Sequence, residues 1–288
     1  MQRILFITLG VLLTLTSCVK NENNSLTYKR YCYNRIVKAG SFDASYDMLE
    51  CTYQLDFDNR VSSFTYNAID FGMGEKCDIK IENIPFKQTA SGYEFSDITD
   101  FVPVIVNGEK SDGWFVQGFS GSWELLGDYT MSTEFFQVQF TISIDGTMYN
   151  VQSNMVVYGF ISCVTNITDK DGNISGSNAG TYSVTFNPQT SKSQIVINGA
   201  RLSSVMSSGV DNWVISDIPA VPTYNGFEFD AKADSIFKPR QSNNVVPNVE
   251  IQVVSGNVYI PEKTFTARLI VNGEQVDVRA YMEKISKE

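Results

Sequence analysis

The sequence predicts an all-β protein made of two tandem antiparallel β-barrel domains. Three observations support this prediction. Short segments alternate apolar and polar residues with a period of two, as strands buried on one face do. Segments of the first half recur in the same order in the second half. No long helical periodicity appears after the first 17 residues.

An internal repeat relates the two halves of the chain. The matched segments are Thr52–Phe57 with Thr181–Phe186, Ile79–Pro85 with Trp213–Pro219, Gly92–Phe95 with Gly226–Phe229, Phe101–Pro103 with Phe237–Pro239, and Ile142–Gly146 with Leu269–Gly273. One such match can arise by chance, but five in series hardly can. We therefore expect the two copies to share one fold.

The strands of each copy follow from the alternation. In the first copy it covers Thr52–Phe57, Ser63–Ile69, Asp78–Ile84, Val102–Val106 and Phe136–Ile144. In the second copy it covers Tyr182–Phe186, Gln194–Ile197, Trp213–Ile218, Val249–Val254, Phe265–Val271 and Val276–Tyr281. Several short antiparallel strands separated by turn residues favour a barrel or a sandwich, and a closed barrel removes exposed edges.

Turn residues separate these strands. Asp145-Gly146 and Asn272-Gly273 each stand between two alternating runs. Both dipeptides accept positive φ at the two central positions, which predicts a type I′ hairpin at the end of each copy. Pro85 and Pro219 follow isoleucines and are expected to mark strand ends, since proline donates no ladder hydrogen bond.

The pattern divides the chain into five parts. These are a signal peptide at 1–17, a tether and lead-in at 18–46, a first barrel domain at 47–163, a linker at 164–178 and a second barrel domain at 179–288. The linker prediction rests on the polar, glycine-containing composition of that segment.

Three strand patterns resemble a known family. They are the opening Thr-Tyr-x-x-x-Phe, the pair Ile-Glu-Asn-Ile-Pro and Ile-Ser-Asp-Ile-Pro, and the Gly-aromatic-Glu-Phe strand. Over most of residues 47–285 the chain resembles the calycin-like (lipocalin-like) β-barrel lipoproteins common in Bacteroidetes. The resemblance implies a β-barrel and transfers no site residues.

The N-terminus has the layout of a secretory signal. Arg3 precedes an apolar run, Ile4–Leu15, that is too short to span a bilayer. Leu15-Thr16-Ser17-Cys18 resembles the bacterial lipobox, which implies cleavage before Cys18 and acylation of its thiol. We therefore expect a lipid anchor on Cys18 that holds the protein to the bacterial outer membrane, at its periplasmic or cell-surface face. The alternative is an ordinary secretory signal that happens to contain Cys18.

The charge balance argues against nucleic acid as a partner. The net charge is −10, and loss of Arg3 with the signal makes it −11. An acidic surface repels phosphate backbones.

The residue types also restrict the chemistry. The sequence has no histidine, which excludes Ser-His-Asp and Cys-His catalysis, and it has no Cys-x-x-Cys pair for a structural zinc site. We expect no metal and no cofactor. The remaining cysteines leave two alternatives open, a Cys51–Cys163 bridge or free thiols at all of Cys32, Cys51, Cys77 and Cys163.

Four short motifs have weak catalytic, metal-binding or modification interpretations. Ser235-Ile-Phe-Lys238 has the spacing of a serine–lysine pair on a helix, but the surrounding pattern is not helical. Glu124, Asp128 and Glu134 offer carboxylates for glycoside hydrolysis, although sequence cannot set their separation. Asp169–Asn173 begins like a calcium loop but lacks its later glycine and glutamate, so we interpret it as a solvated turn. Asp234-Ser235-Ile236 resembles an O-glycosylation motif of Bacteroidetes.

An aromatic segment gives the best indication of binding. Trp114, Phe115, Phe119 and Trp123 lie close together in the first copy and have no counterparts in the second. Their flat faces could stack on sugar rings, and these four are our candidate ligand contacts. The alternative is a core strand whose aromatic side chains fill the barrel.

These observations predict a lipid-anchored, non-enzymatic ligand-binding module for a small apolar molecule or a glycan. A structural or interaction protein with filled barrels is the alternative. A glycan-active hydrolase is the third hypothesis.

Overall fold

The structure is a computed structural model that describes residues 19–21, 24–95, 100–127, 131–232 and 235–283. The chain divides into two compact units, one formed by 1–123 and 136–155 and the other by 124–135 and 156–288. The described residues form strands and turns without a helix. None of these residues therefore belongs to a helix long and apolar enough to cross a membrane.

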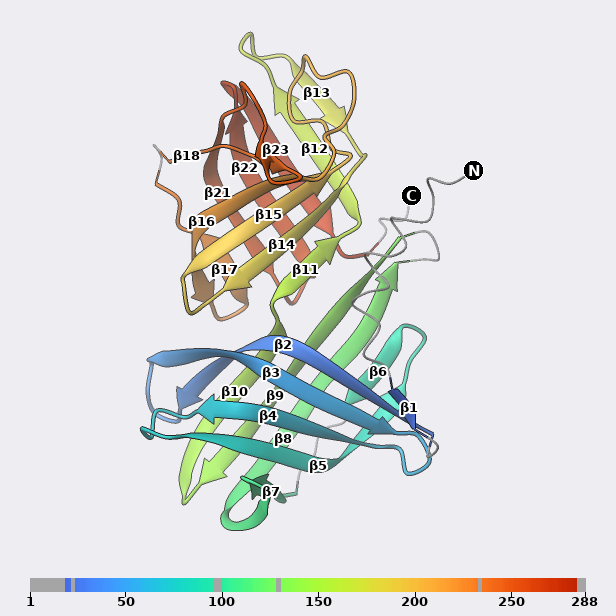
Figure 1. Cartoon of the computed structure of the whole chain (residues 1–288), viewed down its shortest axis with the longest axis vertical. Coiled ribbons are helices and arrows are strands. Elements are labelled where there is room, and N and C mark those ends of the chain that lie inside the picture. The colour runs from blue at the N-terminus through green and yellow to red at the C-terminus, as the bar shows by residue number, and fades with distance from the viewer. Residues whose placement is uncertain (1–18, 22–23, 96–99, 128–130, 233–234, 284–288) are drawn as a thin grey trace. The chain divides into compact units, whose positions relative to one another are not determined.

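The first unit is a closed antiparallel barrel (Figure 1). Its strands are β1 (Val19–Asn21), β2 (Ser25–Lys38), β3 (Ala44–Asp56), β4 (Val61–Asp70), β5 (Lys76–Gln88), β6 (Gly92–Phe95), β7 (Val102–Val106), β8 (Glu109–Gly127), β9 (Ser132–Ile144) and β10 (Thr147–Met155). The ladder runs β2-β10-β9-β8-β6-β5-β4-β3, and β3 pairs back to β2, which closes the ring. β7 pairs with β5 and β8. The far ends of β8 and β9, residues 124–135, group with the second unit.

The second unit repeats this strand order in a curled sheet. Its strands are β11 (Val157–Phe160), β12 (Ser162–Thr168), β13 (Ile174–Ser177), β14 (Thr181–Asn187), β15 (Lys192–Asn198), β16 (Trp213–Thr223), β17 (Gly226–Phe229), β18 (Ile236–Phe237), β19 (Arg240–Gln241), β20 (Asn244–Val245), β21 (Ile251–Tyr259), β22 (Thr264–Val271) and β23 (Glu274–Tyr281). β14, β15, β16, β17, β21, β22 and β23 follow one another as β3, β4, β5, β6, β8, β9 and β10 do. Two related all-β barrel-like domains are therefore confirmed.

The seam of the second unit differs from that of the first. β11 pairs with β14, β12 pairs with β23, and Ile161 between them donates its N–H to the carbonyl of Tyr281 at 3.0 Å. The continuous segment of β11 and β12 therefore joins both ends of the sheet. β11 pairs with β14, but the edge of β12 that faces away from β23 pairs with β13. In the first barrel, by contrast, β2 pairs with β3 along the full length of both strands.

The sequence match of the opening strands was displaced by two residues. Ile79 and Trp213 occupy matched positions in the two copies. In the first unit Ile79 pairs with Tyr66, which pairs with Cys51. In the second unit Trp213 pairs with Ile197, which pairs with Tyr182. Tyr182 therefore corresponds to Cys51, not to Tyr53. A shift of two keeps every side chain on the same face, so the alternation could not reveal it.

The predicted strand ends at the prolines were wrong. Pro85 lies inside β5 and Pro219 inside β16. Each follows a register irregularity beside a residue in the left-handed region, Asn83 at φ 59° and Asp217 at φ 61°. A bulge tolerates proline because the ladder is already interrupted there.

The two predicted hairpins are confirmed. Asp145 and Gly146 have φ of 48° and 83°, and Asn272 and Gly273 have φ of 48° and 86°. Positive φ at both central positions is the type I′ geometry.

Two segments predicted as tether and linker contain strands. β2 lies in the lead-in at 18–46, and most of β12 with all of β13 lies in the linker at 164–178. Their inward positions include polar residues, Asn34 on β2 and Thr165 on β12, both fully buried. Polar residues at inward positions interrupt the alternation of apolar and polar residues, so the sequence pattern did not predict these strands.

Aromatic rings fill the interior of the first barrel. Tyr53 stacks on Phe136 with ring centroids 4.9 Å apart, and Phe64 packs against Phe119 at 4.6 Å. All four are at most 1% exposed. The second unit has a similar core, in which Phe186 stacks on Phe227 at 4.6 Å. Aromatic rings thus pack the cores of both units.

We predict that Phe119→Ala lowers the free energy of unfolding of the first unit by about 3–5 kcal/mol, because it leaves a cavity among packed rings. Urea denaturation measures this loss. Phe42→Ala is the control, since Phe42 is 102% exposed in the turn between β2 and β3. Equal effects of the two substitutions would contradict the filled interior.

Candidate functional site

The structure separates the four predicted aromatic contacts. Phe119 is fully buried and Trp123 is 9% exposed, both within the barrel core. Trp114 is half-buried against the same core, with its ring 5.8 Å from Phe71. Phe115 is half-buried too, and its ring lies 6.3 Å from the exposed Phe101. The four therefore share no single surface, and their role in binding stays a prediction.

One end of the first barrel carries a partly exposed group of rings, which we call the aromatic end. It consists of Tyr28, Phe57, Phe86, Tyr93 and Trp123. Tyr93 stacks on Trp123 with centroids 5.3 Å apart and planes 6° apart. Burial raises the pKa of the Tyr93 hydroxyl. Phe57 and Tyr93 remain partly open to solvent.

Cys32, Cys51, Cys77 and Cys163, the cysteines of the described residues, are free thiols, so the Cys51–Cys163 bridge is not formed. The bridge was one of two alternatives, and it depended on Cys163 following the last strand of the first repeat. It lies instead on β12, at the start of the second unit. Its thiol donates to the carbonyls of Ala179 and Gly180. Burial raises the pKa of Cys51 well above its ordinary value.

A polar trough lies on the outer face of the second unit and has a volume of about 430 Å³. Its lining comes from β17, β21, β22 and β23: Glu228, Ser255, Gly256, Asn257, Thr266, Ala267, Arg268, Asp277 and Val278. The pleat explains its shape. Gly256, Ala267 and Val278 are directly opposite one another on three neighbouring strands, and all three face inward. On the outer face their backbone therefore forms the bottom of the trough, between two rows of outward side chains.

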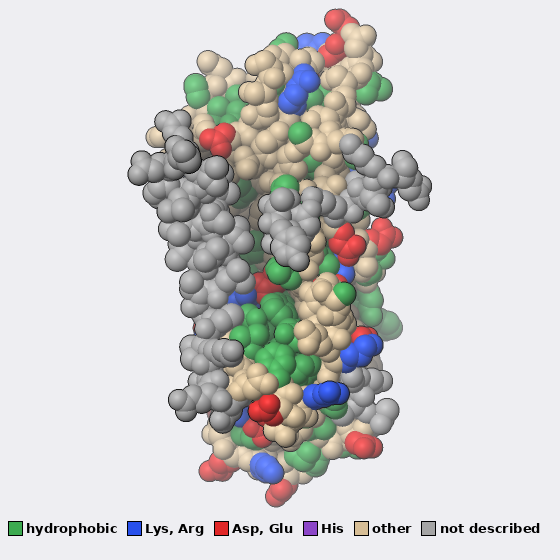
Figure 2. Space-filling model, turned by 90° about the vertical axis from the view of Figure 1, so that its right-hand side faces the viewer, with side chains coloured by type: hydrophobic (Ala, Val, Ile, Leu, Met, Phe, Trp, Pro, Cys, Tyr) green, Lys and Arg blue, Asp and Glu red, His purple; other side chains and the backbone are tan. Residues whose placement is uncertain are grey.

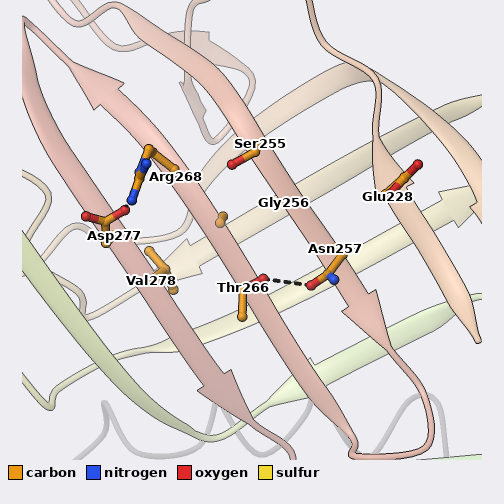
Figure 3. A pocket seen from close by; sticks show the side chains of 9 residues that line it. Glu228, Ser255, Gly256, Asn257, Thr266, Arg268, Asp277 and Val278 are labelled. Atoms are coloured by element: carbon orange, nitrogen blue, oxygen red, sulfur yellow. Dashed lines mark hydrogen bonds and ion pairs between the residues drawn. The ribbon is translucent and has the colours of Figure 1, made fainter.

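The rim of the trough is held by hydrogen bonds (Figure 3). The Arg268 Nε lies 2.7 Å from the Asp277 Oδ1, and Gln275 donates to the Asp277 Oδ2 at 2.7 Å. On the other row, the Thr266 hydroxyl donates to the Asn257 Oδ1 at 2.6 Å. Figure 3 shows Arg268 and Asp277 directed toward each other from neighbouring strands. The trough thus presents guanidinium, carboxylate, amide and hydroxyl groups in fixed positions. Sequence reasoning missed it because its residues come from four strands.

The weaker motifs are not assembled into catalytic or metal sites among the described residues. Glu124 is paired with Lys263, whose Nζ lies 2.8 Å from its Oε2, whereas Asp128 lies outside those residues. Ser235 and Lys238 flank the short strand β18, so no helical turn brings them together. Described residues contain no group of three potential metal ligands from His, Cys, Asp and Glu.

The Asp169 segment is the turn that the sequence predicted. The Asp169 Oδ1 accepts the N–H groups of Asp171 at 2.9 Å and Asn173 at 2.8 Å. Hydrogen bonds from the Asn173 side chain and backbone lower the pKa of Asp169. Its oxygens therefore serve the turn itself.

Two predicted modification sites fall beyond the part of the chain that the structure describes. Cys18 and the signal peptide at 1–17 lie outside it, and so does Asp234 of the possible O-glycosylation motif.

Comparison with known proteins leaves the chain without an assigned family. No family model and no curated protein matches it. Among solved structures, the chain is similar to intact Ap-TbpB (N and C lobes), at 8% identity and a TM-score of 0.22, over 90% of this chain and 76% of that chain. A similarity at this level assigns no function, and the fold above rests on the strand pairings.

A buried carboxylate stabilises the loop between β15 and β16. Glu274 is 8% exposed and accepts the N–H of Ser204 at 2.7 Å as well as the Ser204 hydroxyl. Burial by itself would raise the pKa of Glu274, but hydrogen bonds from Ser203 and Ser204 outweigh it and lower the pKa.

We predict that Glu274→Gln destabilises the second unit by about 2 kcal/mol at neutral pH, because charge-assisted hydrogen bonds are lost. A lowered folded-state pKa means that the carboxylate stabilises above its ordinary pKa and loses this effect as pH falls through the folded value. The gap between wild type and variant in urea denaturation should therefore close on acidification. Glu262→Gln, at an exposed position, is the control. A gap that is constant with pH would refute this role.

Proposed function

We propose that this chain is a lipid-anchored, non-enzymatic binding module of the bacterial cell envelope that binds a glycan in the trough of the second unit. One observation supports the glycan over an apolar ligand. The barrel cores are packed with rings, whereas the trough is polar and open on the outer face.

The chemistry of the trough suits a hydroxyl-rich ligand. Sugar hydroxyls donate and accept, so they pair with amide, hydroxyl and carboxylate groups alike. Arg268 and Asp277 are held by each other and would lose little side-chain entropy on binding. The bottom of the trough runs across three strands and carries no outward side chains, so a linear glycan can lie along it, perpendicular to the strands.

Hydrolysis is less well supported than binding. The trough contains two carboxylates, Glu228 and Asp277. Both oxygens of Asp277 accept hydrogen bonds, from Arg268 and Gln275. Arg268 and Gln275 therefore already occupy both carboxylate oxygens, and this side chain serves the trough as a fixed hydrogen-bond acceptor.

We predict that Arg268→Ala and Asn257→Ala each weaken glycan binding about tenfold, the equivalent of one charged or two neutral hydrogen bonds. A glycan array with wild-type protein identifies the ligand, and calorimetry then gives Kd for each variant. Lys192→Ala breaks an exposed ion pair with Asp217 on the same unit, outside the trough, and should leave Kd unchanged. Unaltered affinity in both trough variants would disprove the site.

The filled interiors also favour a second candidate function, an interaction protein whose barrels act as rigid spacers. In that case the wild-type protein binds no glycan on the array, and the Arg268→Ala and Asn257→Ala variants give the same negative result.

The anchor is tested separately. We predict that, in a Gram-negative host, the mature N-terminal peptide begins at Cys18 and carries acyl chains, and that the protein sediments with membranes. Cys18→Ser should release it into the soluble fraction. Mass spectrometry of the peptide decides the outcome, since a free Cys18 thiol after removal of 1–17 would indicate an ordinary secretory signal.

A further inference from the structure

The aromatic end of the first barrel is an apolar surface backed by packed core rings. Phe86 and Trp123 are nearly buried, while Leu26, Phe57 and Tyr93 are partly exposed and packed on the core. Figure 2 shows that hydrophobic side chains gather on the surface of the first unit. Tyr53, Phe64 and Phe136 pack beneath this end, so it offers a surface that a partner can cover.

The chain enters the barrel at this same end. The carbonyl of Asn24 accepts the N–H of Phe57 at 3.2 Å, and the Asn24 side chain donates to Asp58 at 3.1 Å. β1 pairs with the first residues of β2, so that Val19 lies opposite Thr27. Cys18 directly precedes Val19, and five residues lie between Cys18 and Asn24, so the two are at most about 22 Å apart along an extended chain.

We propose that the aromatic end docks on the lipid bilayer to which Cys18 is anchored. The inference rests on the proposed acylation of Cys18, which would place the membrane within reach of the partly exposed Phe57 and Tyr93. Tyrosine prefers the interface between acyl chains and headgroups, because its ring is apolar and its hydroxyl can be hydrated.

The charges near this end favour a neutral lipid surface. Lys29 is paired with Glu50, and Lys87 is paired with Glu94, each at 3.2 Å. The lysine side chains are 58% and 72% exposed, so they can extend into the headgroup layer. Because each pair is neutral, burial of apolar surface drives the docking and attraction to anionic lipid does not.

The experiment uses the full-length acylated protein in phosphatidylcholine vesicles. A nitrobenzoxadiazole probe is placed on Lys87→Cys at the aromatic end or, as the matched control, on Phe42→Cys at the other end of β3. The native Cys32, Cys51 and Cys163 are buried, and labelling of wild type corrects for the partly buried Cys77. A third protein adds Phe57→Glu to Lys87→Cys, which places a charge on the docking surface.

Docking predicts a blue shift for the probe at 87 and loss of its emission on brominated phosphatidylcholine, with neither change at 42. Phe57→Glu should abolish both changes while flotation shows that the protein stays anchored. Equal spectra at 87 and 42, or no effect of Phe57→Glu, would overturn the docking and leave the anchor intact. If the mass of the N-terminal peptide shows no acyl chains, the anchor itself fails, and the docking that rests on it fails too.

Discussion

The stacking of aromatic rings inside a closed ladder is the constraint on which the first unit depends. Tyr53 contacts Tyr28, Phe64 and Phe136, so rings from four strands meet around one side chain. Closing the sheet into a barrel leaves its eight main strands without an unpaired sheet edge, but it directs one face of each strand toward the barrel axis. Large planar side chains fill the space around that axis. The same packing that holds the barrel together fills its core with rings, whereas the trough and the aromatic end lie on outer surfaces.

The two units share one strand order but present different outer surfaces. In the first, β2 closes the ring along its whole length and its entry point lies beside partly exposed rings. In the second, one segment is divided between β14 and β23, and the outer face of β21, β22 and β23 carries amide, hydroxyl and paired charged groups. An apolar surface near the predicted anchor and a polar trough on the other domain suit a protein held at a membrane that binds a polar ligand.

Local features of the fold were predictable, whereas the pairing of distant residues was not. Asp145-Gly146 and Asn272-Gly273 specify their turns because glycine, asparagine and aspartate adopt positive φ more readily than other residues. By contrast, Pro85 and Pro219 lie within strands because bulges beside Asn83 and Asp217 have already broken the ladder. The shift of Tyr182 relative to Tyr53 was invisible for a related reason, since a displacement of two residues preserves alternation.

The sequence by itself determined the strand class, the repeat and the closing hairpins, because a period of two and a glycine turn are properties of neighbouring residues. Only the tertiary structure decided that Phe119 and Trp123 belong to the core and that Arg268, Asp277 and Asn257 meet in one trough. Those outcomes depend on which strands pair and in what register, and these contacts join residues that the linear pattern does not connect.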